Sequence, residues 1–269
     1  MGRLFWLSDQ QWAVIEPLLP RNKGGARRVD DRRVISGIIH VLKVGSRWCD
    51  CPVDYGPSTT VYNRFNRWSR KRFSTDLVEA LATSGAVTKS TSIDSTYVKA
   101  HRSADGGKGG RKNQAIGASR GGQTTKIHVL TDVIGRPFAF MLTGGNAADS
   151  PVAPHLLAGL KGARYLLADK GYDANSLRKR LRQSAIVPVI PGRSNRKRPI
   201  RYDTKRYKSR HLIENAFCRL KDFRRIATRY DKLARNFLSA VALATLVAFW
   251  LCLMVWNGPS RRHQGCLSW

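Results

Sequence analysis

The stretch Tyr207-Lys-Ser-Arg210-His-Leu-Ile-Glu214, continued as far as Lys221, is the most informative part of this 269-residue chain. At about 100° per residue, its spacing places four polar side chains within roughly a 60° arc of one helix face. These are Tyr207, Arg210, Glu214 and Lys221. Glu214 is also the only glutamate in the last 190 residues. A solvated face with i,i+4 ion pairs would show the same spacing, so spacing alone leaves both interpretations open.

Two aspartate-containing stretches lie upstream of this helix. The first is Thr91-Ser-Ile-Asp94-Ser-Thr-Tyr-Val-Lys-Ala-His101, and the second is Tyr165-Leu-Leu-Ala-Asp169-Lys-Gly-Tyr172-Asp173. A third stretch, Gly117-Ala-Ser-Arg-Gly-Gly-Gln-Thr-Thr-Lys-Ile-His128, lies between them. Together with the spacing Tyr-x2-Arg-x3-Glu-x6-Lys, these stretches resemble the ordered motifs of bacterial insertion-sequence DDE transposases. The chain most resembles the group named after insertion sequence 5, over roughly residues 5–255.

The resemblance implies a DNA transposase that cleaves strands at transposon ends and transfers them into target DNA. It implies three catalytic and metal-binding carboxylates, those of Asp94, Asp169 and Glu214. Such a set can hold two Mg²⁺ (or Mn²⁺) ions, which activate the attacking oxygen and stabilise the leaving oxygen. Water would free a 3′-hydroxyl, which then attacks the target. The implied partner is double-stranded DNA, both terminal inverted repeats and target, bound by a homo-oligomer.

Three other side chains of the helix would support the carboxylates. Arg210 and Lys221 would bind phosphate or orient Glu214, and Tyr207 would stack or donate a hydrogen bond. Two further acids, Asp149 and Asp173, are the ones most easily confused with the catalytic set. For Asp173 the sequence offers a structural role, as the cap of a helix that begins near residue 174.

The net charge of +30 calls for a polyanionic partner, since self-repulsion of that size opposes compaction. The charge is +6 over residues 1–85 and +24 over the remainder. An anionic membrane surface is the less favoured partner, because the basic residues are mixed with a globular apolar pattern. A ribosome-type RNA binder stays open on charge alone.

The cysteines give no disulfide framework and no structural zinc site, because they are odd in number and Cys49-Asp-Cys51 lacks a second ligand pair. Reduced thiols and the lack of a visible cleavable signal peptide indicate a cytoplasmic protein. The resemblance to insertion-sequence transposases implies a bacterial protein associated with the nucleoid. The five cysteines are Cys49, Cys51, Cys218, Cys252 and Cys266.

The segment Phe237–Trp256 is long and apolar enough to meet the length test for a membrane span. Its alanines also suit close helix packing inside a domain. Because the segment directly follows the polar helix, we expect a buried helix packed on the catalytic sheet, with no membrane partner.

Residues 8–85 have the periodicity of helices. Ser8 and Gln11 predict a capping box, and Asp30 or Asp31 predicts the start of a second helix. A third helix, beginning at Pro57-Ser58, resembles the recognition helix of a helix-turn-helix. An ordinary three-helix domain with a solvated face is nearly as compatible with the pattern. The polar face of the third helix supplies the expected DNA-binding residues, namely Asn63, Arg64, Arg67, Arg70 and Lys71.

From residue 88 the pattern changes to strands, expected over 90–99, 125–133 and 137–142, with a turn near Gly135-Arg136. Helix, strand, helix and strand follow over 150–160, 165–169, 174–183 and 186–190. This order is that of an RNase H-like fold. We therefore expect an α+β/α/β protein with a helical, helix-turn-helix-like domain (1–85), an RNase H-like mixed sheet covered by helices (86–256) and a tail (257–269).

Two loops are rich in glycine or basic residues. His101–Gly122 lacks the G-x4-G-K-[ST] pattern of a nucleotide-binding loop and is expected to be flexible backbone beside DNA or a plain loop. Gly192–Arg206 is basic and poor in apolar residues, and a solvated charge run is the alternative to phosphate binding. Its expected DNA-binding residues are Arg196, Lys197 and Arg198.

Two other functional classes compete with a transposase. One is a non-catalytic, basic DNA-binding regulator derived from a transposase, which the intact set of three acids disfavours. The other is a membrane-associated basic protein, supported only by the apolar segment near the C-terminus.

Overall fold

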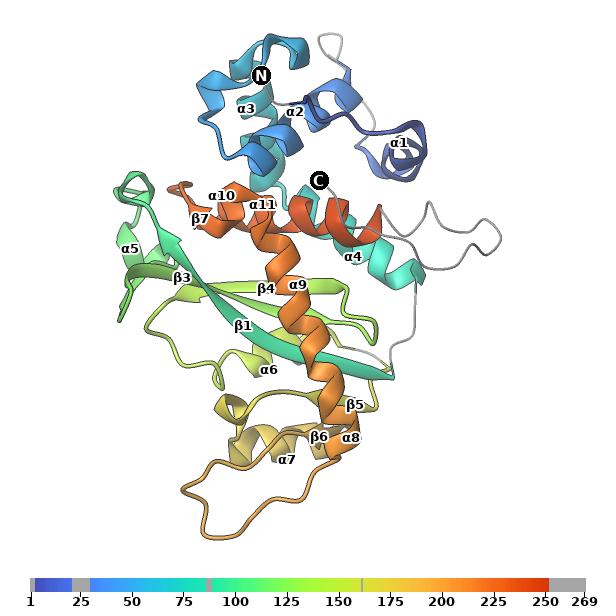
Figure 1. The fold of residues 1–269 in the computed structure, drawn as a ribbon, viewed down its shortest axis with the longest axis vertical. Coiled ribbons are helices and arrows are strands. Elements are labelled where there is room, and N and C mark those ends of the chain that lie inside the picture. The colour runs from blue at the N-terminus through green and yellow to red at the C-terminus, as the bar shows by residue number, and fades with distance from the viewer. Residues whose placement is uncertain (1–2, 21–29, 86–88, 161, 252–269) are drawn as a thin grey trace.

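The computed structural model describes residues 3–20, 30–85, 89–160 and 162–251 (Figure 1). The N-terminal part is helical, as expected. Ser8 forms the predicted capping box with Gln11, and the Asp30 side chain caps the second helix by accepting from two backbone N–H groups. The four helices are α1 (Asp9–Ile15), α2 (Asp31–Val44), α3 (Ser58–Arg70) and α4 (Phe73–Gly85).

The centre of the molecule is a mixed sheet. Its strands are β1 (Ser90–Ala100), β2 (Gly117–Ser119), β3 (Gly122–Thr131), β4 (Pro137–Gly144), β5 (Tyr165–Leu167), β6 (Val187–Val189) and β7 (Thr228–Arg229). The order is β2-β3-β1-β5-β6, with β4 paired to β3 and β7 to β1. The first three long strands are antiparallel, whereas β5 and β6 run parallel to β1. The turn between β3 and β4 uses Gly135 at φ 86°, as the sequence predicted.

Helices cover both faces of this sheet and create two cores. On one face α9 (His211–Lys221) packs Ile213 and Phe217 against Ile127 and Val129. On the other face α6 (Ala153–Leu156) and α7 (Asn175–Gln183) close a second core around Ile93 and Leu130. A mixed sheet with helices on both faces is therefore the architecture.

The apolar C-terminal segment continues the first core. It forms α11 (Ala234–Thr245) and one π-helical turn, Leu246–Trp250, which follow the short α10 (Arg224–Ala227). α11 packs against β4 and against α2, α3 and α4, so that the N-terminal and C-terminal helices share one core (Figure 1). The segment is thus a helix on the sheet as far as residue 251, and residues 252–256 lie outside the described part. Within the described residues, no helix has both the length and the apolarity needed to cross a membrane.

Two expectations need correction. The loop expected at His101–Gly122 contains a helix, α5 (Gly110–Asn113), and the edge strand β2. The Gln114 side chain holds it in place by accepting from the Ala234 backbone N–H. The polar helix is also not uniform, because a 3-10 turn, Lys208–Arg210, joins α8 (Thr204–Tyr207) to α9.

Candidate active site

Asp94 lies near the middle of β1 and faces α9. Its side chain is 14% exposed. One carboxylate oxygen accepts from the backbone N–H of Ser95 at 2.8 Å, and the other accepts from Arg210 Nη2 at 2.5 Å. A residue of the central strand is therefore joined directly to the polar helix.

Asp169 follows β5, the parallel neighbour of β1. In the parallel register of β1 and β5, Ser92 lies opposite Leu167, so two further residues along both strands bring Asp169 beside Asp94. Neighbouring strands lie about 4.8 Å apart. The Asp169 side chain accepts from the Gly171 N–H at 2.7 Å and thereby caps the 3-10 turn Lys170–Tyr172.

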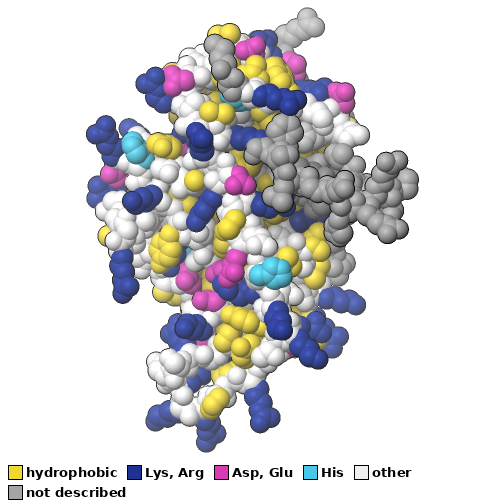
Figure 2. All heavy atoms as spheres, in the orientation of Figure 1, with side chains coloured by type: hydrophobic (Ala, Val, Ile, Leu, Met, Phe, Trp, Pro, Cys, Tyr) yellow, Lys and Arg dark blue, Asp and Glu magenta, His cyan; other side chains and the backbone are white. Residues whose placement is uncertain are grey.

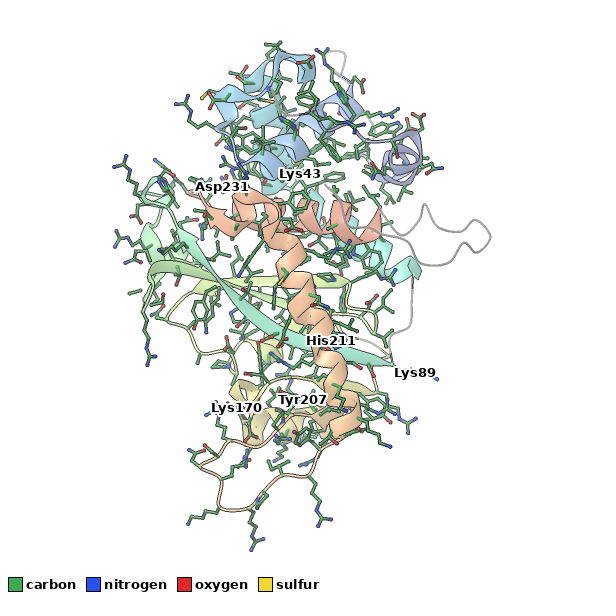
Figure 3. All side chains as sticks on the ribbon, in the orientation of Figure 1. Lys43, Lys89, Lys170, Tyr207, His211 and Asp231 are labelled. Atoms are coloured by element: carbon green, nitrogen blue, oxygen red, sulfur yellow. The ribbon has the colours of Figure 1, made fainter. Side chains whose placement is uncertain are left out.

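Glu214 reaches the same site from α9. Its carboxylate is 57% exposed and pairs with Arg210 Nη1 at 2.7 Å. Arg210 therefore lies between Asp94 and Glu214 and donates to both. Figure 3 shows the neighbouring residues Tyr207 and His211 on the helix that runs across the sheet.

The polar face of the helix has a second anchor on β1. Lys221 Nζ donates to the hydroxyl of Thr96 at 2.8 Å. Because Asp94 and Thr96 lie on the same face of β1, Arg210 and Lys221 tie the helix to one line of the strand. Tyr207 is half-buried and packs edge-on against Tyr202, with ring centroids 5.4 Å apart.

Burial dominates the electrostatics of Asp94. It raises the pKa of this carboxyl to about 6, an effect that Arg210 opposes and Asp169 reinforces. Asp94 is thus a desolvated acid, and among the described residues Arg210 is the one cation that forms an ion pair with it. A second positive charge at this position would favour its ionised form.

The donor chemistry of the site suits a hard divalent cation, since Asp94, Asp169 and Glu214 offer only oxygen. Among the described residues, no three His, Cys, Asp or Glu side chains are arranged as a metal cluster. The Arg210 guanidinium instead provides the positive charge between Asp94 and Glu214. The residues fit a metal ion in type and charge, provided that Arg210 moves aside.

Two acids outside the set have defined roles. Asp149 binds Lys126 and Ser95 on the opposite face of the sheet. Asp173 does not cap α7, because the N-cap is Ala174, which makes no side-chain cap. It is instead a buried anchor whose pKa is held well below its usual range, burial being overcome by hydrogen bonds to Arg196, the Arg193 backbone and Arg178. The cap prediction for Asp173 is wrong.

Tyr172 is a buried residue for which the sequence predicts no role. Its pKa is raised mainly by burial, and further by the carboxylates of Asp149, Asp94 and Asp169. The phenol is therefore close enough to these three carboxylates for their charge to affect its ionisation. The only sequence signal was its position three residues after Asp169.

The exposed face of α3 differs from the expected one at a single position. Asn63, Arg67, Arg70 and Lys71 are exposed. Arg64 is only 7% exposed, forms an ion pair with Asp31 and stacks on Trp68. The expectation that Arg64 is available to DNA is therefore wrong. Its place three residues after Val61 and four before Trp68 was the signal for burial.

Part of the basic loop after β6 is anchored to the rest of the protein by its own arginines. Arg196 binds both carboxylate oxygens of Asp173 through Nε and Nη2, so its guanidinium is engaged within the protein. Lys197 and Arg198 remain exposed. Figure 2 shows Lys and Arg side chains gathered at this end of the molecule.

Two family models match the chain. A model described as "Transposase DDE domain" matches residues 87–249, and one described as "Putative transposase of IS4/5 family" matches residues 7–78. The chain belongs to the DDE transposase family, and it is a DDE-type transposase.

Individual relatives are also transposases. A putative transposase for insertion sequence element IS6501 of Brucella ovis is 40% identical over 137 residues, which are 49% of this chain and 98% of that protein. A putative transposase for IS402 of Burkholderia cepacia is 31% identical over 151 residues, 52% of this chain and 66% of that one. Among solved structures, a piggyBac transposase synaptic complex aligns with a TM-score of 0.47 at 12% identity, covering 92% and 73% of the two chains.

Proposed function

We propose that this transposase cleaves DNA strands at the ends of an insertion sequence and joins them to target DNA, with Asp94, Asp169 and Glu214 as its catalytic carboxylates. The observation that carries the proposal is the double contact of Arg210 with Asp94 and Glu214. It brings the helix acid to the strand acid, and the parallel register adds Asp169. The competing proposal, a non-catalytic DNA-binding regulator, gives no reason for three acids to gather at one site.

The same three carboxylates would hold two divalent cations, Mg²⁺ or Mn²⁺. Asp94, in the middle, would contribute to both ions, while Asp169 and Glu214 would each complete one. When bound, such ions activate the attacking oxygen and stabilise the leaving oxygen at phosphorus. Burial of Asp94 supports this role, because a desolvated carboxylate gains more from a nearby positive charge.

Arg210 and Lys221 would bind the DNA phosphates. Arg210 contacts both acids, and with a metal ion held by those acids its guanidinium would be free to bind a phosphate beside the reacting bond. Lys221, anchored at Thr96, holds a second positive charge further along β1. Tyr207, on the same face of the helix, would stack or donate a hydrogen bond.

Binding of double-stranded DNA would rest on two basic surfaces. Residues 1–85 would form a helix-turn-helix-like domain that reads the terminal inverted repeats with Asn63, Arg67 and Arg70 of α3 and with Lys71 directly after it. Residues 86–256 would be the RNase H-like catalytic domain, in which Lys197 and Arg198 touch phosphate. We further propose that the protein acts as a homo-oligomer on DNA, in the cytoplasm and at the nucleoid.

The test is strand cleavage of a labelled duplex that carries the terminal repeats flanking the gene. Asp94→Asn and Glu214→Gln should abolish Mg²⁺- or Mn²⁺-dependent cleavage and leave binding of the duplex nearly unchanged, because phosphate contacts supply the affinity. Equal loss of binding and cleavage in a folded variant would argue against the assignment.

A further inference from the structure

A polar cluster, buried at Lys126 and His128 and partly exposed at Asp149, lies behind Asp94 on the sheet face that α9 does not cover. It comprises Ser95 of β1, Lys126 and His128 of β3, and Asp149 of the loop after β4. We refer to these four residues as the Asp149 cluster. Ser95 stands directly opposite His128 in the antiparallel register, so the side chains of both strands meet on this face.

Asp149 is the centre of the cluster. One of its carboxylate oxygens accepts from Lys126 Nζ and from the Ser95 hydroxyl, each at 2.9 Å. The Lys126 ammonium also donates to the Ala147 carbonyl at 2.6 Å and lies 4.8 Å from the centre of the Tyr97 ring. The loop carrying Asp149 is therefore clamped onto β1 and β3.

Burying Lys126 and His128 has a desolvation cost, so the cluster is an inefficient way to stabilise the sheet. The Lys126 side chain is 4% exposed, and His128, bonded to the Thr143 hydroxyl at 2.8 Å, is fully buried. Well-packed apolar residues often replace a buried ion pair without loss of stability. The cluster calls for a purpose besides holding the sheet together.

Ser95 links the cluster to the active site. Its hydroxyl is fixed by Asp149, while its backbone N–H donates to the carboxylate of Asp94. Any rotation of β1 at this residue would move both groups at once, because successive side chains point to opposite faces of a strand. The position of Asp94 is thus set from behind by Asp149.

We propose that Asp149 is a positioning residue, neutralised by Lys126, that acts through Ser95 to hold Asp94 in the orientation required for metal binding. This inference rests on the proposed function, because it assumes that Asp94 is a metal ligand. Groups that orient metal ligands typically contribute about 10- to 100-fold to metal affinity or activity. Asp149 itself need not touch metal or DNA.

The experiment is a Mn²⁺ titration of the full chain, followed by thermal denaturation, since a ligand that binds only the native state raises Tm. Asp149→Asn and Ser95→Ala should each raise the Mn²⁺ concentration for half-maximal stabilisation by about 10-fold or more. Their affinity for the terminal-repeat duplex should stay that of the native chain. Ser95→Ala removes a single oxygen, so it keeps the test valid should Asp149→Asn fail to fold.

Asp231→Asn is the matched control. Asp231 is also a buried aspartate paired with a cation, Arg225, and it lies far from Tyr207 and the active site (Figure 3). This variant should lower the Mn²⁺-free Tm without changing the Mn²⁺ requirement. An unchanged Mn²⁺ requirement in folded Ser95→Ala and Asp149→Asn, with a lower Tm only, would overturn the inference. Absence of any Mn²⁺ effect on the native chain would instead overturn the proposed metal site.

Discussion

Arg210 donates to the carboxylate of Asp94 across 116 residues of sequence, at 2.5 Å. The same guanidinium binds Glu214, four residues further along the helix. A single side chain thus brings a strand acid and a helix acid into one site and balances their charge. Arg210 therefore neutralises the two acids in the metal-free site, and it is also a candidate phosphate ligand.

Replacing Arg210 by Ala should destabilise the metal-free protein by about 2 kcal/mol, because a desolvated Asp94 loses its cation; loss of one partner of a fully buried pair costs more. Saturating Mn²⁺ should restore most of this loss, which thermal denaturation with and without the metal would reveal. Lys208→Ala, an exposed neighbour, serves as the control. If Mn²⁺ stabilises the Arg210 variant less than the native chain, Arg210 helps the metal to bind and does not stand in for it.

Arg67 and Arg70 lie on the exposed face of α3. Replacing both by Ala should weaken binding of the terminal-repeat duplex and reduce the slope of log K against log salt by about 2, close to one per phosphate contact. Binding titrations at several salt concentrations measure the slope. The exposed Lys43 of α2 provides a charge-matched control when it is changed to Ala together with Arg47. Equal slopes in all these proteins would exclude α3 as the DNA-binding face.

Arg64 should behave differently from its neighbours on α3. Arg64→Ala removes the buried partner of Asp31 and the cation stacked on Trp68. We expect a loss of about 3 kcal/mol in the free energy of unfolding, measured with urea. The salt dependence of DNA binding by the folded fraction should match that of the native chain, and a reduced slope would return Arg64 to the DNA-binding surface.

His128 makes stability depend on pH. Burial lowers its pKa to about 4, from an ordinary value of 6.5. The unfolded chain therefore binds more protons than the folded one between these values, and the stabilisation present above pH 6.5 is lost as the pH falls toward 4. Between pH 7 and pH 5 the loss should be about 2 kcal/mol. Urea titrations at pH 7 and pH 5 measure this loss of unfolding free energy. The loss should be smaller in His128→Gln than in the native chain by about 2 kcal/mol. Equal losses in the two proteins would show that His128 does not titrate in this way.

Local patterns were sufficient for most of the architecture, and together with the family resemblance they pointed to the three proposed catalytic acids. The helix spacing around Glu214 and the short strands around Asp94 and Asp169 are properties of neighbouring residues, which a sequence displays directly. The mixed sheet covered by helices followed from the order of helices and strands along the chain. The helix and strand within residues 101–122 could not be predicted, because they are held by a hydrogen bond between Gln114 and Ala234, which are 120 residues apart.

The errors in side-chain roles have the same origin. The position of Asp173 just before Ala174 predicts a helix cap, whereas its observed partners include the Arg193 backbone N–H and the Arg196 guanidinium of the basic loop. Asp149 owes its place to Lys126 and Ser95, each on a different strand. Arg64 is the exception, because helical periodicity alone places it between Val61 and Trp68 on the buried face.

The core shared by α11 and the N-terminal helices has a consequence for how this chain can be divided. A cut near residue 86 would separate α2, α3 and α4 from the helix against which they pack. Each fragment would then present a bare apolar face to water and should aggregate when made alone. Produced together, the two fragments should find each other and rebuild one particle, as a complementation pair. The N-terminal helices and the central sheet should therefore be inherited as one unit, not as modules that recombination could exchange freely.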